Sequence, residues 1–296
     1  MKNKPIKHHY IPQFILKNFC DEEGFLWYKD VKTNTIENFS TKDIYFENNL
    51  YRDEREKKDK DSVEIELALS KYEDEISKIL LPRYYFEKKF YITLNEHETI
   101  KLFIAIMGFR SKRASEYFKN TNGDLAKDYY HKYQNDEDYD YLWKRNLKEL
   151  VKCRSYMEVM VNSNIDDPIK GFMLRDTGGT NSFLRVIESE NEEFILSDAI
   201  PFVMCAEDKN GLELIMYEAF PISPKRALLI IYQYPQFNIR YNDAILSKGF
   251  FEEPAVKDGK IEMYVKTIKD NRVKEFNRQL VEISQFGLVS RTGKFN

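Results

Sequence analysis

The stretch that decides the fold is TLNEHETIKLFIAIMGFR, residues 93–110. Its centre, Leu102–Phe109, is apolar on nearly every side, which is typical of a helix enclosed by other elements. Thr93 followed by Glu96 forms a capping-box pattern, so the helix is expected to begin there. We expect the helix to continue to about Phe118 and to be the hub of the hydrophobic core.

Periodic apolar residues predict further helices on both sides of this stretch. One is expected from a cap at Asp61 and Ser62 to about Leu80, a second over residues 138–161 and a last one over 269–286. The polar run at 52–61 is expected to be an exposed loop or a solvated helix start. Strand patterns predict a hairpin over residues 25–39 with its turn at 32–34, two runs at 182–188 and 193–196 joined by a turn at 189–191, and strands at 213–218 and 226–232.

The composition indicates a folded protein with a substantial core. The 296 residues are 42% hydrophobic and 15% aromatic, and the formal net charge of −3 argues against a uniformly basic nucleic-acid-binding protein, although not against a local basic patch. We predict a single α+β domain over residues 1–296. It has a helical middle (about 61–162), an N-terminal β-hairpin, a C-terminal mixed or antiparallel sheet and a terminal helix. A subdivision near residue 165 is a weaker alternative.

No feature of the chain predicts a membrane or secreted protein. No apolar run approaches the roughly 20 residues of a membrane span, and the basic start MKNKPIKHHY has no apolar stretch behind it. We therefore expect a cytoplasmic protein. Cys20, Cys153 and Cys205 are far apart and fit neither a disulfide framework nor a zinc site, so they are expected to be reduced.

Two of the four histidines of the chain are adjacent, His8 and His9, within KHHYIPQFILKNF, residues 7–19. The apolar side chains of this segment predict that it is buried and ordered. In an extended strand neighbouring side chains point to opposite faces, so the two imidazoles should have different surroundings. We expect His8 to face a cleft as an acid or base, and His9 to pack inward. A purely structural role, with one imidazole bonded to a backbone carbonyl, is an equally weighted alternative.

Carboxylates form a second group of candidates. Glu66 and Glu73 are seven residues apart, two helical turns, and therefore share a helix face. Such a pair can hold a divalent metal ion or divide acid and base roles, although ordinary surface acids have the same spacing and are commoner. Asp198 follows the strand pattern 193–196, where it is either a catalytic or ligand-orienting carboxylate or a turn-former.

Basic side chains complete the candidate set. Arg110 and Arg113 follow the apolar helix, and they either bind a carboxylate or phosphate or extend to solvent. Lys225 and Arg226 precede an expected strand, where they either meet phosphate or solvate the strand start. The chain has no phosphate-binding glycine loop, GxSxG, HExxH, Cys-Cys zinc pair or dinucleotide fingerprint. The common motif-bearing NTPases, hydrolases, zinc proteases and dehydrogenases are therefore disfavoured.

These residues carry a resemblance to a known family. KHHYIPQFILKNF resembles the opening HHYVPQFYLRNF of the bacterial family catalogued as domain of unknown function 4238. The family elements N-F-Y, E-x-x-L-S-x-x-E, F-x-x-S-D-N-P and P-L-S-P-x-x-A-L-L-L resemble residues 49–51, 66–73, 194–201 and 221–230. Of the family's Q-x-x-R-T-P only the arginine, Arg110, is present, and one extra residue separates Asp198 from Pro201. The resemblance implies no reaction but a shared polar set of His8, His9, Gln13, Glu66, Glu73, Arg110 and Asp198.

The mixture of histidines, carboxylates and arginines favours an enzyme acting on a phosphate-containing substrate, in particular a nuclease-like effector of a toxin or anti-phage defence system. Nucleic acid or a nucleotide is then the expected partner. The alternative is a non-enzymatic module that binds a protein partner through its aromatic surface, with a structural histidine pair. Convergence of the candidates in one open cleft distinguishes the two. The expected roles are catalysis for His8, His9, Arg110 and Asp198, substrate binding for Gln13, Lys225 and Arg226, and divalent-metal binding for Glu66 and Glu73.

Overall fold

The computed structural model describes residues 7–52, 63–119, 139–174, 181–207, 211, 213–234 and 245–295. Its central element is the helix α4 (Leu94–Phe109), whose side chains from Ile100 to Met107 are all buried. Both hydrogen bonds of the capping box between Thr93 and Glu96 are present. The predicted helix start and its role as the hub of the core are therefore confirmed.

The prediction that this helix continues to about Phe118 is wrong. α4 ends at Phe109, and a separate helix, α5 (Lys112–Lys119), follows after Arg110 and Ser111. The Ser111 hydroxyl donates to the Gly108 carbonyl at 2.8 Å and accepts from the Ala114 backbone N–H at 3.0 Å. A serine that bonds both flanking helix ends in this way offers the backbone an alternative to continued helix.

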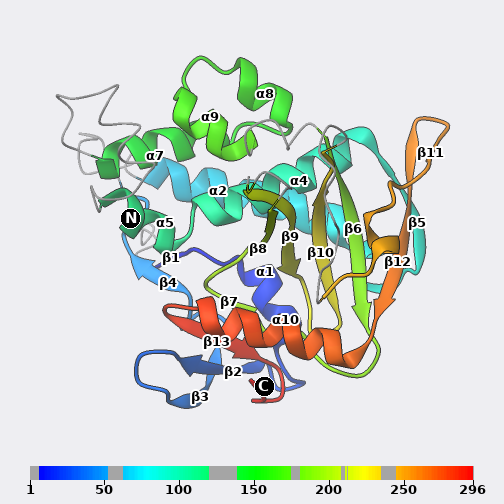
Figure 1. The fold of residues 1–296 in the computed structure, drawn as a ribbon. Helices are drawn as coiled ribbons and strands as arrows, with labels where there is room; N and C mark the ends of the chain where they lie inside the picture. Colours follow the sequence, from blue (N-terminus) through cyan, green and yellow to red (C-terminus); the bar gives the residue numbers. More distant parts are fainter. Residues whose placement is uncertain are drawn as a thin grey trace.

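Most of the other helices lie around α4 on one side of a large sheet (Figure 1). The predicted helix at 61–80 is observed as α2, whereas its expected cap at Asp61 and Ser62, and residues 53–61 of the expected polar loop, lie outside the described residues. The helix predicted over 138–161 is two helices, because Ser155 caps a new helix with its side chain. The elements of this layer are α1 (Gln13–Leu16), α2 (Glu64–Leu80), α3 (Arg83–Phe86), α7 (Tyr139–Leu150), α8 (Tyr156–Val161) and α9 (Asp167–Leu174).

The large sheet is mixed, as expected. Its strand order is β11-β12-β6-β10-β9-β8, with β5 paired to β12, and only the β12–β6 pair is parallel. The predicted strand 226–232 is β10 itself, and the predicted 182–188 and 213–218 lie within β6 and β9. The bounds are β5 Lys89–Thr93, β6 Ser182–Ser189, β8 Phe202–Glu207, β9 Glu213–Pro221, β10 Arg226–Tyr232, β11 Val256–Lys257 and β12 Lys260–Ile268.

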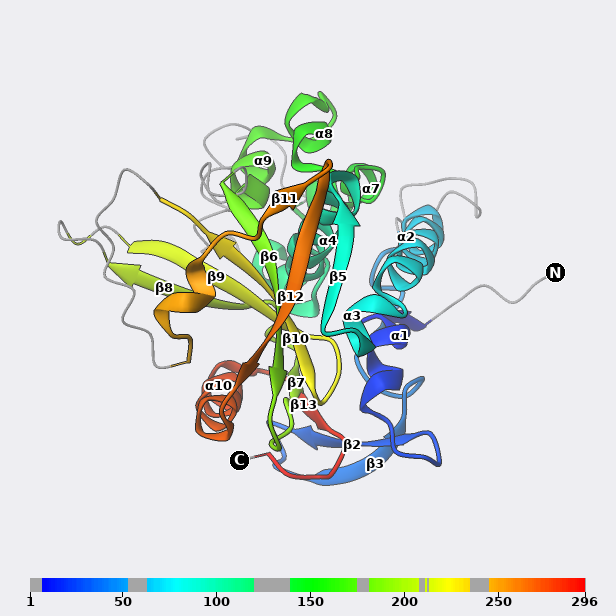
Figure 2. The same cartoon turned by 90° about the vertical axis from the view of Figure 1, so that its right-hand side faces the viewer.

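Helices cover both faces of this sheet (Figure 2). Because strand side chains alternate between faces, Leu228 and Ile230 of β10 join the core under α4, whereas Leu229 and Ile231 join a second core under the terminal helix α10 (Asp270–Ile283). The continuous apolar sequence of β10 follows from this burial on both sides. The terminal helix predicted at 269–286 is confirmed, three residues shorter at its end.

A smaller sheet has the order β3-β2-β13-β7 and contains the predicted N-terminal hairpin. The strand predicted at 193–196 is largely wrong, because residues 193–195 form no strand and only Leu196 enters β7, which pairs with β13 rather than with a strand of the large sheet. Cysteines 20, 153 and 205 are free thiols. The strands of this sheet are β2 (Phe25–Asp30), β3 (Ile36–Ser40), β7 (Leu196–Ser197) and β13 (Gly287–Ser290).

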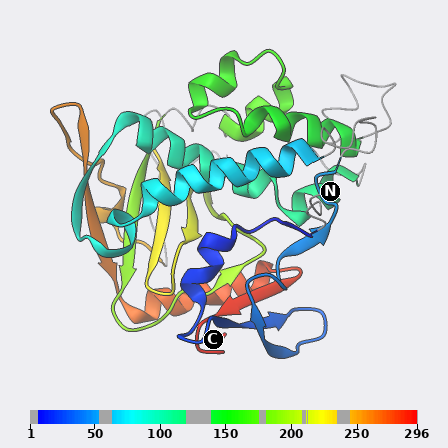
Figure 3. The ribbon, with the colours of Figure 1, turned by 180° about the vertical axis from the view of Figure 1, so that it is seen from behind.

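The N-terminal segment is buried, as predicted. Strand β1 (Lys7–His9) pairs with β4 (Phe46–Asn48), and α1 then lies below α2 (Figure 3). Ile15, Leu16 and Phe19 are completely inaccessible to solvent. Within the described part of the chain, no helix has both the length and the apolar character needed to cross a membrane.

Candidate functional site

The two histidines face opposite ways because β1 is extended and paired with β4. His8 is fully buried; its Nδ1 accepts the Tyr51 backbone N–H at 3.0 Å, and its ring stacks on the Tyr51 ring with centroids 5.6 Å apart. His9 is only half-buried. The expectation that His8 faces a cleft is therefore wrong, because the pairing with β4 directs His8 inward towards Tyr51, and of the two imidazoles His9 is the less buried.

The surroundings of His9 favour its neutral form. Burial lowers its pKa below the ordinary value of 6.5, and the positive charges of Arg110 and Lys7 lower it further, against the opposing backbone carbonyls of Lys42 and Thr41. Gln13 Nε2 lies 3.4 Å from His9 Nδ1, so these two predicted site residues are in contact. At neutral pH the imidazole is consequently neutral and able to take up a proton.

Arg110 links the N-terminal segment to α2. It directly follows the last residue of α4 and is 1% exposed. Its guanidinium donates to a Glu73 carboxylate oxygen, to the His9 carbonyl and, through Nε at 3.3 Å, to the Tyr51 hydroxyl. The Tyr51 hydroxyl in turn donates to the Arg110 carbonyl at 2.9 Å. A buried cation needs such partners, and Arg110 has acquired them from three separate elements.

Glu66 differs from Glu73 in its surroundings although both lie on one face of α2. Its Oε2 is buried and has no hydrogen-bond partner among the described residues. Burial raises the pKa of Glu66 from 4.5 to about 7; the Arg110 charge opposes this rise and the Glu73 charge adds to it. Two carboxylates that share a helix face have thus acquired different chemistry, one paired with arginine and the other poised to titrate near neutral pH.

We call these side chains the polar cluster: His8, His9, Gln13, Tyr51, Glu66, Glu73 and Arg110. Tyr51 was missed as a candidate in the sequence, where its only mark was its place in the N-F-Y element of the resemblance. Glu66 and Glu73 as metal ligands remain a prediction. Across the described ranges, no three His, Cys, Asp or Glu side chains gather in a way that could hold a metal ion by themselves. The group next to the two carboxylates is the Arg110 guanidinium.

The structure does not bring Asp198 into direct contact with the polar cluster. Its carboxylate accepts the backbone N–H groups of Gln285, Phe286 and Gly287 at 3.2, 3.0 and 2.8 Å. These bonds hold the chain where it enters β13, which agrees with the turn-forming alternative for this aspartate.

Lys225 and Arg226 lie near the opposite end of α2 from Glu66. Arg226 is 2% exposed, and its guanidinium binds the Glu188 carboxylate and the carbonyls of Tyr84 and Glu87. Lys225 donates to backbone carbonyls, including that of Glu192 at 3.3 Å. Of the three predicted substrate-binding residues, these two therefore have structural partners away from the histidines, whereas Gln13 contacts His9.

Comparison with known proteins yields one match. A family model described as "Protein of unknown function (DUF4238)" matches residues 7–293, nearly the whole chain. No curated protein and no solved structure matches the chain.

Proposed function

The chain belongs to the DUF4238 family, whose activity is not established, and from that premise we propose that it is an enzyme acting on a phosphate-containing substrate at the polar cluster. His9 and Glu66 are the proton-transfer groups in this proposal. The leading candidate is a nuclease-like effector of a bacterial toxin or anti-phage defence system. Hydrolysis of a phosphodiester needs a base for the attacking water and an acid for the leaving oxygen.

The observation that carries the proposal is the unpartnered Glu66 carboxylate oxygen. Leaving a buried acid without a hydrogen bond costs free energy, and folding alone gives no reason to retain it. With a pKa of about 7 the side chain is present in both protonation states near neutral pH. A general acid or base is most effective in that condition.

Arg110 acts in this proposal as a positioning residue rather than a free phosphate clamp. Its donors already bind Glu73, His9 and Tyr51, so it fixes the backbone of the histidine strand against α2. Its charge also lowers the pKa of Glu66 relative to burial alone. Replacing it removes the link between β1 and α2 and leaves Glu73 without its partner.

The alternative, a non-enzymatic binding module, is favoured by a different observation. His8 and Arg110 are 0% and 1% exposed, and their visible contacts fasten backbone segments together. If the whole cluster serves that purpose, none of its members transfers a proton. The two proposals therefore differ in what His9 and Glu66 do.

The test is cleavage of single-stranded and double-stranded DNA and RNA, with and without EDTA, together with toxicity or phage protection in a bacterial host. Glu66→Gln and His9→Ala should each lower the cleavage rate by about 100-fold or more, the usual contribution of a proton-transfer group. Asp74→Asn is the matched control, because Asp74 lies on α2 but is exposed and forms an ion pair with Lys78 on the same helix. Folded His9→Ala and Glu66→Gln proteins that act like the wild type leave only the binding module.

A further inference from the structure

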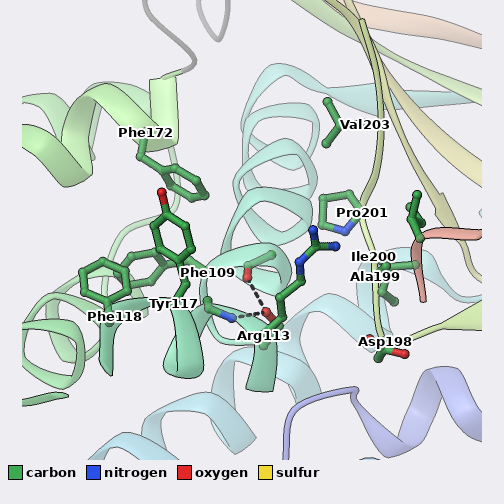
Figure 4. A pocket seen from close by; sticks show the side chains of 14 residues that line it. Phe109, Arg113, Tyr117, Phe118, Phe172, Asp198, Ala199, Ile200, Pro201 and Val203 are labelled. Carbon is green, nitrogen blue, oxygen red and sulfur yellow. Dashed lines mark hydrogen bonds between the residues drawn. The ribbon is translucent and has the colours of Figure 1, made fainter. Parts of the chain in front are cut away.

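A cavity of about 650 Å³ lies apart from the proton-transfer groups of the polar cluster, between the α4–α5 junction and residues 198–203. Its volume is within the range of ligand sites for small molecules. Figure 4 shows aromatic side chains, among them Tyr117 and Phe172, on one side and Ile200, Pro201 and Val203 on the other. Arg110 belongs to the same junction, but its guanidinium points to Glu73 and His9, which do not line this cavity.

The wall of the cavity is apolar and open to solvent. Tyr117, Val203 and Ile283 come from α5, β8 and α10 and are 40%, 37% and 37% exposed. Apolar surface of this kind, gathered in one concave place, is stabilised when a ligand removes it from water. Of two smaller cavities, the one of about 260 Å³ mixes charged side chains of both signs with its aromatic ones, and the one of about 200 Å³ is lined largely by polar and charged side chains.

Arg113 gives the cavity its charge. It is the only lysine or arginine among the described lining residues, and Figure 4 shows its guanidinium between Tyr117 and Pro201. No hydrogen bond or ion pair of this guanidinium is formed with any residue that the structure describes. The carboxylate of Asp198 also lines the cavity, but it accepts hydrogen bonds from three backbone N–H groups rather than from Arg113. A guanidinium without a partner beside apolar walls suits an anionic group attached to an apolar body.

We propose that this cavity is a binding site for a small aromatic monoanion, whose ring packs between the α5 aromatics and Pro201 while its anionic group meets Arg113. The proposal is independent of catalysis at the polar cluster, because it uses none of the proton-transfer groups assigned there. The proposed ligand carries a single negative charge, because Arg113 is the one cationic side chain among the described lining residues and the other proposed contacts are apolar.

Fluorescence titration with two matched probes tests the proposal. 1-Anilinonaphthalene-8-sulfonate is an aromatic monoanion, and N-phenyl-1-naphthylamine is its neutral counterpart. Wild-type protein should bind the anion saturably and more tightly than the neutral probe. Arg113→Gln should weaken binding of the anion about tenfold, the effect of losing one charge-assisted contact, and leave the neutral probe nearly unchanged. Arg291→Gln, which replaces an exposed arginine elsewhere on the chain, should change neither.

Filling the cavity gives an independent measurement. Val203→Trp and Ile283→Trp replace partly exposed lining residues from two elements, β8 and α10, so each should fold, as its thermal melting checks, and each should abolish binding of both probes. Equal weakening of both probes by Arg113→Gln overturns the charge assignment. Undiminished binding to a folded tryptophan variant, or no saturable binding to the wild type, overturns the site itself.

Discussion

Glu66 is a residue whose protonation links the stability of the fold to pH. Its carboxyl group has a pKa of about 7 in the folded chain and an ordinary value of 4.5 when the chain is unfolded. The folded state therefore keeps this proton up to a higher pH than the unfolded state does. Folding is therefore favoured at low pH, and this contribution is lost as the pH rises from 4.5 through 7. The difference between the two pKa values corresponds to at most about 3 kcal/mol in the free energy of unfolding.

Glu66→Gln should remove this pH dependence. Urea unfolding at pH 8 should show a variant more stable than the wild type by up to about 3 kcal/mol, and the two proteins should differ little at pH 4.5. Asp74→Asn, on the exposed face of the same helix, should show no such pattern. A stability difference that is the same at both pH values would contradict the raised pKa. If Glu66→Gln is more stable than the wild type but cleaves nucleic acid more slowly, that combination is typical of the substitution of a functional residue.

The histidine pair shows what local sequence can and cannot decide. Alternation along a strand predicts that His8 and His9 face opposite ways, and this is confirmed. Which of them faces inward depends on the β1–β4 register and on Tyr51, more than 40 residues away. Adjacent residues carry no information about such a partner, so the choice between the two imidazoles could not be predicted.

Substitution of each histidine by alanine should separate their roles. His8→Ala leaves the buried Tyr51 N–H without its acceptor and removes a stacked ring, so it should lower the free energy of unfolding by about 1–3 kcal/mol. His9→Ala, at a half-buried position, should cost less than about 1 kcal/mol and should mainly impair cleavage. Chemical denaturation of both variants in parallel measures the difference. Equal losses of stability would show that both imidazoles are structural.

At the scale of elements, the beginning of α4 was easier to predict than its end. The start of α4 depends on Thr93 and Glu96, three residues apart, and is therefore visible in the local sequence. At its end, the Ser111 hydroxyl bonds the backbone of both flanking helices, and the Arg110 guanidinium is in addition held by Glu73, His9 and Tyr51 from distant parts of the chain. The apolar pattern continues into α5, so periodicity alone predicted one long helix where tertiary bonds divide it.

α4 also carries an element-scale prediction. Ile104 is completely buried in the middle of the helix, so Ile104→Asp places an unpaired charge in the core and should prevent cooperative folding. Leu94→Asp is the matched control, because Leu94 is 54% exposed in the first turn, where a negative charge is favourable. Circular dichroism melts of the two variants make the comparison. A soluble Ile104→Asp protein that melts like the wild type would contradict the burial of this helix.

At the scale of the whole molecule, the N-terminal segment joins the helical layer to the large sheet. Phe14 packs on Phe103 of α4, with ring centroids 6.1 Å apart, and Phe103 packs on Phe220 of β9 at 5.8 Å. The Asn18 side chain donates to the Ile222 carbonyl at 2.9 Å. The α+β class followed from the order of helix and strand patterns, but these contacts join residues about 90 to 200 positions apart. Local patterns cannot specify such pairings.

Removal of residues 1–19 should therefore prevent the rest of the chain from folding cooperatively. The truncation exposes the surface that Ile15, Leu16 and Phe19 cover, and it deprives Arg110 of the His9 carbonyl and Tyr51 of its stacked imidazole. We expect aggregation or loss of a cooperative melting transition, because apolar burial contributes about 25 cal/mol per Å² and a buried arginine loses a partner. Lys17→Ala, at an exposed position of the same segment, should melt like the wild type. A truncated chain that also melts like the wild type would show that the two layers hold together without this segment.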